Sequence, residues 1–172
     1  MKRLFILLIS LSALLISCDK ENETQPQGDL FNTPITDWTL TKSEVKAKVK
    51  LNLVEDLSAD DILLLLGPWD TDGDGSLKYS GDSFFSSVQY GFYNNQKTLE
   101  CARCVFNFTN ITTEDKVLSF LQKKFNNEYV ICNTDDGKNY IFYTSFGMVV
   151  FEVKSVGIIT FTKRTHEWYY KY

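Results

Sequence analysis

An acidic, glycine-containing stretch has the residue spacing in this sequence that best fits metal chemistry. Three aspartates alternate with other residues from position 70, and a glycine follows the third directly. In EF-hand-like loops, carboxylates at positions one, three and five converge on Ca²⁺, and a glycine at six permits the sharp turn. The twelfth position holds Gly81 instead of the bidentate glutamate, which predicts weak affinity. A solvated Asp/Gly turn is the alternative. The predicted calcium ligands are the side chains of Asp70, Asp72, Asp74 and Asp82 and the carbonyl of Ser76.

Three cysteines offer thiol chemistry in the second half of the chain: Cys101, Cys104 and Cys132. The first two have the spacing of a redox motif, but that motif needs a helix amino terminus to lower the thiol pKa. Their neighbours instead alternate as in a strand, where residues three apart point to opposite faces. We therefore predict structural cysteines, present as one disulfide with a buried thiol or as buried thiols. A zinc site that includes His166 would match no known ligand spacing.

Other catalytic patterns are weak. His166, the single histidine, lies near the carboxyl terminus, where side chains are rarely held rigidly enough for catalysis. The sequence contains neither a Gly-x-Ser-x-Gly nucleophile turn nor a glycine-rich phosphate loop. The aromatic tail at 168–172 is interpreted either as a platform for sugars or as a packed edge strand. We predict no catalytic residues and no enzyme activity.

The amino terminus has the layout of an export signal. A basic head is followed by an apolar run from Leu4 to Ile16, which is too short to span a bilayer permanently. Leu15-Ile-Ser-Cys18 resembles the lipobox of bacterial lipoproteins. The resemblance implies that the chain is cut before Cys18 and that this cysteine carries the lipid anchor, with the amino terminus acylated. The polar stretch that follows is predicted to be a flexible tether. Its first residues look like the acidic export signals of Bacteroidetes lipoproteins. The alternative is a merely soluble linker. The predicted organisation is a signal peptide at 1–17, a lipid-anchored tether at 18–34 and one domain at 35–172, divisible into halves 35–110 and 111–172.

Charge limits the partners that this domain can bind. The signal peptide removes two of the 18 basic residues and none of the 22 acidic ones, so the net charge falls from −4 to −6. Nucleic acid needs a basic patch, and so does a generic polybasic membrane-binding mode. We therefore expect no nucleic-acid partner and membrane attachment through the anchor at Cys18 alone.

Hydrophobic periodicity and turn-forming residues predict the helices and strands that position these side chains. Residues 42–54 carry conflicting signals. A capping box at Thr41–Glu44 predicts a helix, whereas apolar and polar residues that alternate from Val45 to Leu53 predict a strand; we favour the helix. Turn residues and alternation bound the predicted strands. Further helices are predicted at 58–66 and 112–125, and strands at 77–80, 84–93, 99–108, 128–133, 139–145, 148–154 and 156–163.

A resemblance to a group of proteins rests on Pro34–Trp38, Thr41–Lys46, Leu77–Gly81, Tyr90–Tyr93 and Val117–Leu121. These segments look like those of uncharacterised Bacteroidetes lipoproteins of similar size. The layout is similar to small tandem α+β domains of the β-lactamase-inhibitor-like and BamE-like type. The order of the predicted elements, α-β-β-β-α-β-β-β-β, itself predicts an α+β fold, an antiparallel sheet with two to three helices, and this resemblance agrees with it. The resemblance also implies an adaptor or inhibitor rather than an enzyme.

Two functions follow as hypotheses. The first is a lipid-anchored, non-enzymatic binding or adaptor domain at the outer membrane, on its periplasmic or cell-surface side, that recognises an envelope protein. The second is a surface lipoprotein that binds or processes glycans, stabilised by Ca²⁺. Neither hypothesis requires a cofactor, and Ca²⁺ is the single candidate cofactor.

Overall fold

The computed structural model describes residues 29–58, 73–93, 96–110, 112–125 and 128–163. Cys18, Asp70, Asp72 and His166 lie outside these ranges, and so do the aromatic tail and nearly all of the helix predicted at 58–66. The described elements, in chain order, are α2 (Lys42–Lys48), β1 (Leu53–Leu57), β2 (Gly75–Ser80), β3 (Ser87–Phe92), β4 (Cys101–Phe106), α4 (Glu114–Phe125), β5 (Val130–Thr134), β6 (Gly137–Thr144), β7 (Gly147–Val153) and β8 (Gly157–Thr162).

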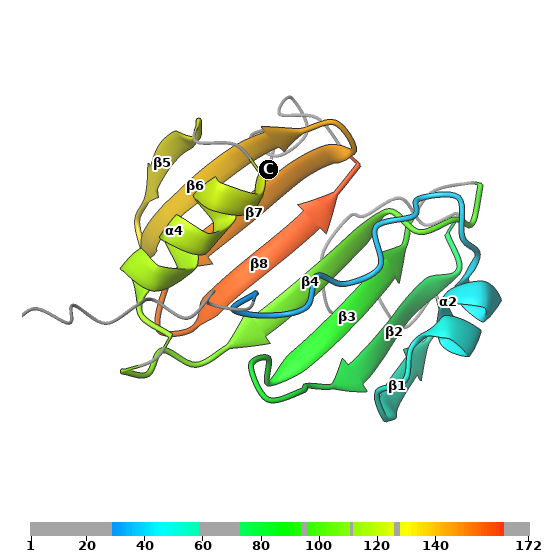
Figure 1. The fold of residues 1–172 in the computed structure, drawn as a ribbon. Coiled ribbons are helices and arrows are strands. Elements are labelled where there is room, and N and C mark those ends of the chain that lie inside the picture. Colours follow the sequence, from blue (N-terminus) through cyan, green and yellow to red (C-terminus); the bar gives the residue numbers. More distant parts are fainter. Residues whose placement is uncertain (1–28, 59–72, 94–95, 111, 126–127, 164–172) are drawn as a thin grey trace, which may run out of the picture.

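All eight strands form one antiparallel sheet in the order β1-β2-β3-β4-β8-β7-β6-β5 (Figure 1). The chain makes a meander from β1 to β4, passes through α4, and makes a second meander from β5 to β8. The two meanders meet where β4 pairs with β8, from Cys101 opposite Thr162 to Phe106 opposite Gly157. Within the described part of the chain, β1 and β5 are therefore the edges of the sheet.

The predicted α+β class is wrong, because the fold is mainly β. The described helices have only 7 and 12 residues beside an eight-stranded sheet. The helix predicted at 42–54 begins as its capping box predicts but has only 7 residues, so it covers only the first part of the predicted range. The Glu44 carboxylate accepts the Thr41 backbone N–H at 2.8 Å, so a helix begins there. It ends at Lys48, where Val49 is extended (φ −73°, ψ 129°), and strand β1, which the prediction omitted, begins only at Leu53, where the alternating stretch ends.

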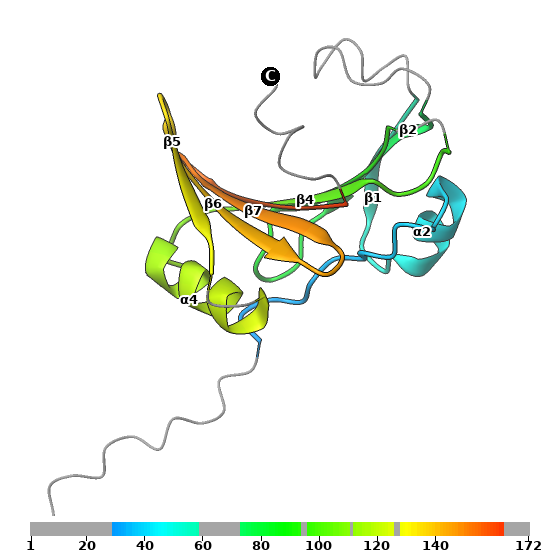
Figure 2. The ribbon, with the colours of Figure 1, turned by 90° about the horizontal axis from the view of Figure 1, so that it is seen from above.

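The hydrophobic core lies on the face of the sheet that carries both helices (Figure 2). Because side chains alternate between faces along each strand, the register aligns apolar residues into rows. One row runs from Leu77 through Tyr90 and Ala102 to Phe161 across four strands. All four are buried. The row crosses from the first meander to the second, so the two meanders share a single core.

The segment that precedes α2, residues 29–41, packs against this core. Phe31 packs on Phe120 of α4 and on Phe85, with ring centroids 4.5 and 4.9 Å away. The Trp38 indole N–H donates to the Phe146 carbonyl at 2.7 Å, in the turn between β6 and β7. Residues near the start of the described chain therefore contact α4 and both meanders.

The remaining sequence predictions of local structure agree with the described elements. The helix predicted at 112–125 is α4, and six of the seven predicted strands extend a few residues beyond the observed ones or match them closely. The strand predicted at 84–93 starts only at Ser87, because the Asp82 carboxylate accepts the N–H groups of Phe84 and Phe85 and makes a turn there. Neither described helix has the length and apolar character needed to cross a membrane.

Candidate binding edge

The hairpin of β5 and β6 exposes an edge whose backbone groups have a defined direction. Its turn has two residues, Asp135 and Asp136, and Thr134 pairs with Gly137 across it. The closing pair of such a hairpin directs its backbone groups inward, and the direction alternates along the strand. Cys132 and Val130 therefore bond to β6, whereas the N–H and C=O groups of Ile131 and Asn133 point away from the sheet. No second described strand pairs with β5, so within the described part of the chain these groups lack a strand partner.

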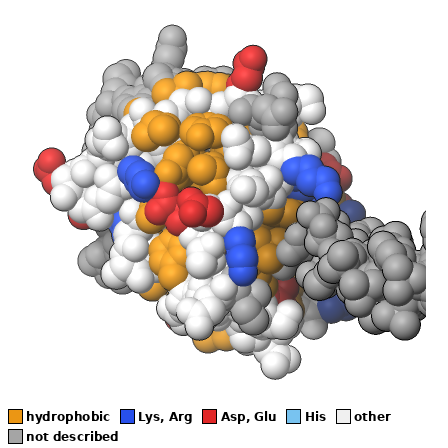
Figure 3. All heavy atoms as spheres, turned by 60° about the vertical axis from the view of Figure 1, so that its left-hand side comes forward, with side chains coloured by type: hydrophobic (Ala, Val, Ile, Leu, Met, Phe, Trp, Pro, Cys, Tyr) orange, Lys and Arg blue, Asp and Glu red, His pale blue; other side chains and the backbone are white. Residues whose placement is uncertain are grey.

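The side chains of this edge are uncharged and largely apolar. Val130 is 44% exposed and Ile131 is 51% exposed, and Tyr143 on β6 is 48% exposed. Ile131 lies opposite Tyr140, on the α4 face, while Val130 lies opposite Ile141 on the other face. On the side of the molecule that carries β5 and α4, hydrophobic side chains gather next to acidic and basic ones (Figure 3). An added strand would therefore meet apolar surface on both faces.

The opposite edge, β1, is built differently. Its register shifts between Leu53 and Glu55, which is a bulge or irregularity that interrupts regular pairing. Glu55 pairs with Lys78 at 2.7 Å, and Asp56 pairs with Lys42 at 2.7 Å. Bulges and charges are devices that discourage strand addition. They occur on β1 although Leu53 and Val54 are exposed there, and β5 has neither.

Acidic residues flank the β5 edge at both ends. Glu128 precedes the strand, and Asp135 and Asp136 form the turn that follows it; all three are exposed. Lys154 lies 2.8 Å from Asp136. Hydrogen bonds from Lys154 and Thr134 hold the pKa of Asp136 below its usual value, so this carboxylate is charged at neutral pH.

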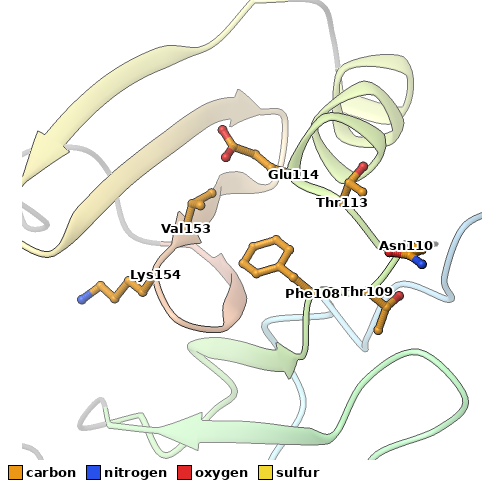
Figure 4. Close-up of a pocket in the computed structure, with 7 residues that line it drawn as sticks. All are labelled: Phe108, Thr109, Asn110, Thr113, Glu114, Val153 and Lys154. Carbon is orange, nitrogen blue, oxygen red and sulfur yellow. The ribbon is translucent and has the colours of Figure 1, made fainter.

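A hollow of about 420 Å³ lies near this edge, between the segment after β4, the start of α4 and the end of β7 (Figure 4). The Phe108 ring faces it, and Lys154 extends away from that ring. The Glu114 carboxylate lies 2.6 Å from Lys138 and accepts the Tyr140 hydroxyl. Partial burial raises the pKa of Glu114, but these two contacts outweigh that effect and lower it. Both charged residues of the hollow are thus engaged within the protein. The lining residues are Phe108, Thr109, Asn110, Thr113, Glu114, Val153 and Lys154.

The structure separates the described residues of the predicted calcium loop. Asp74 precedes β2 and pairs with Lys97 at 3.1 Å, whereas Asp82 follows β2 and serves as a turn cap. The extended strand between them spans roughly 20 Å, so it does not bring the two carboxylates together. Ser76 is buried within β2. No cluster of three metal-ligating side chains occurs among the described residues. Binding of Ca²⁺ through Asp70 and Asp72 stays a prediction.

The three described cysteines lie in strands β4 and β5. Cys104 lies on the core face of β4, and Cys101 lies on the other face, near Gly91. Burial raises the pKa of the Cys104 thiol well above its usual value. Cys132 packs against a small cluster of Ile141, Met148 and Val150. No disulfide joins the three described cysteines.

No protein-family model, curated protein or solved structure matches this chain. The resemblance to Bacteroidetes lipoproteins therefore stays a prediction from the sequence. Sequence reasoning also missed the β5 edge as a site. A strand at 128–133 before an Asp-Asp-Gly turn was recognisable, but its position at the end of the sheet depends on how distant strands pair.

Proposed function

We propose that this protein is a lipid-anchored cell-envelope protein whose domain binds a protein partner of the envelope without catalysing a reaction. The partner contributes an extended segment that pairs with β5. The observation that carries the proposal is the contrast between the two edges of one sheet. The β1 edge combines a register shift with ion pairs, whereas β5 presents outward backbone groups and uncharged side chains.

The lipid anchor and the tether fit this function. Anchoring at Cys18 would hold the domain at the membrane, and the polar stretch to residue 34 would let it reach a neighbouring protein. Strand addition draws its affinity from main-chain hydrogen bonds. A partner with a short extended segment would therefore be sufficient.

Two substitutions at one position test the proposal. Proline at Asn133 removes an outward N–H without removing a bond to β6, and edge strands tolerate proline at such positions. Alanine at Asn133 keeps the N–H and removes the side chain. The tagged full chain, extracted with mild detergent from its native membrane, is expected to retain its partner with N133A and to lose it with N133P. A protein that is recovered alone in both variants and in the wild type would contradict the proposal.

A further inference from the structure

We infer that the segment recognised by β5 is uncharged and apolar at its centre and carries basic residues at both ends. This inference rests on the proposed function and specifies the chemistry of its partner. It follows from the side chains at the centre of the edge and the charges at its two ends.

The centre of the edge selects for apolar, β-branched or small residues. A strand paired with β5 would place one side chain beside Ile131 on the α4 face and others beside Val130 and Cys132 on the opposite face. Ile131 and Val130 are about half exposed and carry no charge. A charged residue opposite them would lose solvation without gaining a partner. The partner residues at these positions are therefore uncharged.

The acidic residues at the two ends of β5 favour positive charge at the two ends of the partner segment. Glu128 and Asp135 are exposed and take part in no ion pair between described residues, and one lysine, Lys154, offsets Asp136. Seven residue steps separate Glu128 from Asp135, which is about 23 Å in an extended chain. A partner segment of about eight residues with Lys or Arg at each end would place opposite charges beside both carboxylates. The negative charge of the whole chain would attract the same segment from a distance.

A second copy of this chain fits the β5 edge less well than a segment with basic ends. A two-fold axis at Cys132 would place Glu128 opposite Asp136 of the second copy, and like charges opposite each other are destabilising. An axis at Ile131 would place Glu128 opposite Thr134 and still supply no positive charge. Residues 128–136 contain no Lys or Arg, so self-pairing cannot neutralise the ends in either register.

The test uses three synthetic peptides and the full chain in detergent micelles. All peptides share the centre Thr-Val-Thr-Val-Thr, and their ends carry lysines, glutamines or glutamates. Fluorescence polarisation measures affinity for the wild type, N133A, N133P and the double variant E128Q/D135N. The lysine peptide is expected to bind the wild type about fivefold more tightly than the glutamine peptide, and the glutamate peptide more weakly still. The preference should shrink in about 0.5 M salt and in E128Q/D135N, and N133P should weaken binding of every peptide while circular dichroism stays unchanged.

The outcomes separate this inference from the proposed function. Equal affinity for the three peptides, lost in N133P, would overturn the charge preference and leave β5 as a binding edge. No binding of any peptide to the wild type would overturn both. A dimer in light scattering that N133P dissociates would show that a second copy occupies the edge, and would overturn the inference in favour of self-association.

Discussion

The contact between Gly157 and Phe106 gives the sharpest prediction about the fold, because it lies where the two meanders join. A Cβ added at Gly157 would lie 2.1 Å from the ring carbon Cζ of Phe106, whereas carbon atoms in contact stay about 3.5 to 4.0 Å apart. The ring is fully buried. Its neighbours include Phe84 and Phe151, with ring centroids at 5.0 and 6.1 Å. It therefore cannot retreat without disturbing the core.

The size of the effect follows from two opposing terms. Replacing a glycine within a strand by alanine ordinarily stabilises by roughly 0.5 to 1 kcal/mol. Overpacking a filled core costs about 1 to 3 kcal/mol. Because the added Cβ would clash with three ring carbons of Phe106, the overpacking cost should lie in the upper part of its range, and we expect Gly157→Ala to lower the free energy of unfolding by about 1 to 2 kcal/mol, measured by urea denaturation followed by circular dichroism.

A double-mutant cycle identifies the cause. Phe106→Leu destabilises by itself because it truncates a buried ring, but it frees the space that the new methyl group needs. The cost of G157A should then fall by at least about 1 kcal/mol in the F106L background. An equal cost of G157A in both backgrounds, or a G157A protein as stable as the wild type, would refute the packing argument for the β4–β8 joint.

Three further predictions concern charge, burial and the anchor. Because Lys138 and Tyr140 lower the pKa of Glu114, its ion pair should stabilise the fold above the usual carboxyl pKa, and this stability should be lost as the pH falls through the lowered value. E114Q should therefore cost less than about 1 kcal/mol at pH 7 and nothing at strongly acidic pH, and a constant cost in urea titrations across that range would contradict this. Because Cys104 is fully buried with a raised thiol pKa, maleimide labelling followed by mass spectrometry should modify it only after unfolding; rapid native labelling would disprove its burial. Replacement of Cys18 by alanine should abolish metabolic labelling with palmitate, and unchanged labelling would exclude this residue as the anchor.

The α4 helix and the strands from β4 onward were predictable because their signals are local. Apolar residues alternate along β4, and turn residues such as Asp135-Asp136-Gly137 delimit the hairpins. The capping box at Thr41–Glu44 likewise predicts the start of α2. Local signals did not specify where α2 ends, because Lys46 and Lys48 favour a helix by propensity while the alternation of apolar and polar residues around them favours a strand. The structure places only Lys42–Lys48 in α2 and starts β1 at Leu53, and with described helices of 7 and 12 residues beside an eight-stranded sheet the fold is mainly β rather than α+β.

The sequence by itself determined the alternating faces of the strands and the turn at Asp135-Asp136-Gly137, whereas the inward and outward directions of the backbone groups on β5 follow from the observed pairing of Thr134 with Gly137. The sequence also carries the signal and lipobox pattern from which the anchor is inferred. Only the tertiary structure decided that β4 pairs with β8 and that β1 and β5 consequently become the edges. Strand order depends on contacts between residues far apart in the chain, such as Phe106 and Gly157, which no short stretch of sequence specifies. Val130 and Ile131 could be buried in a central strand, and the edge position of β5 is what leaves them exposed.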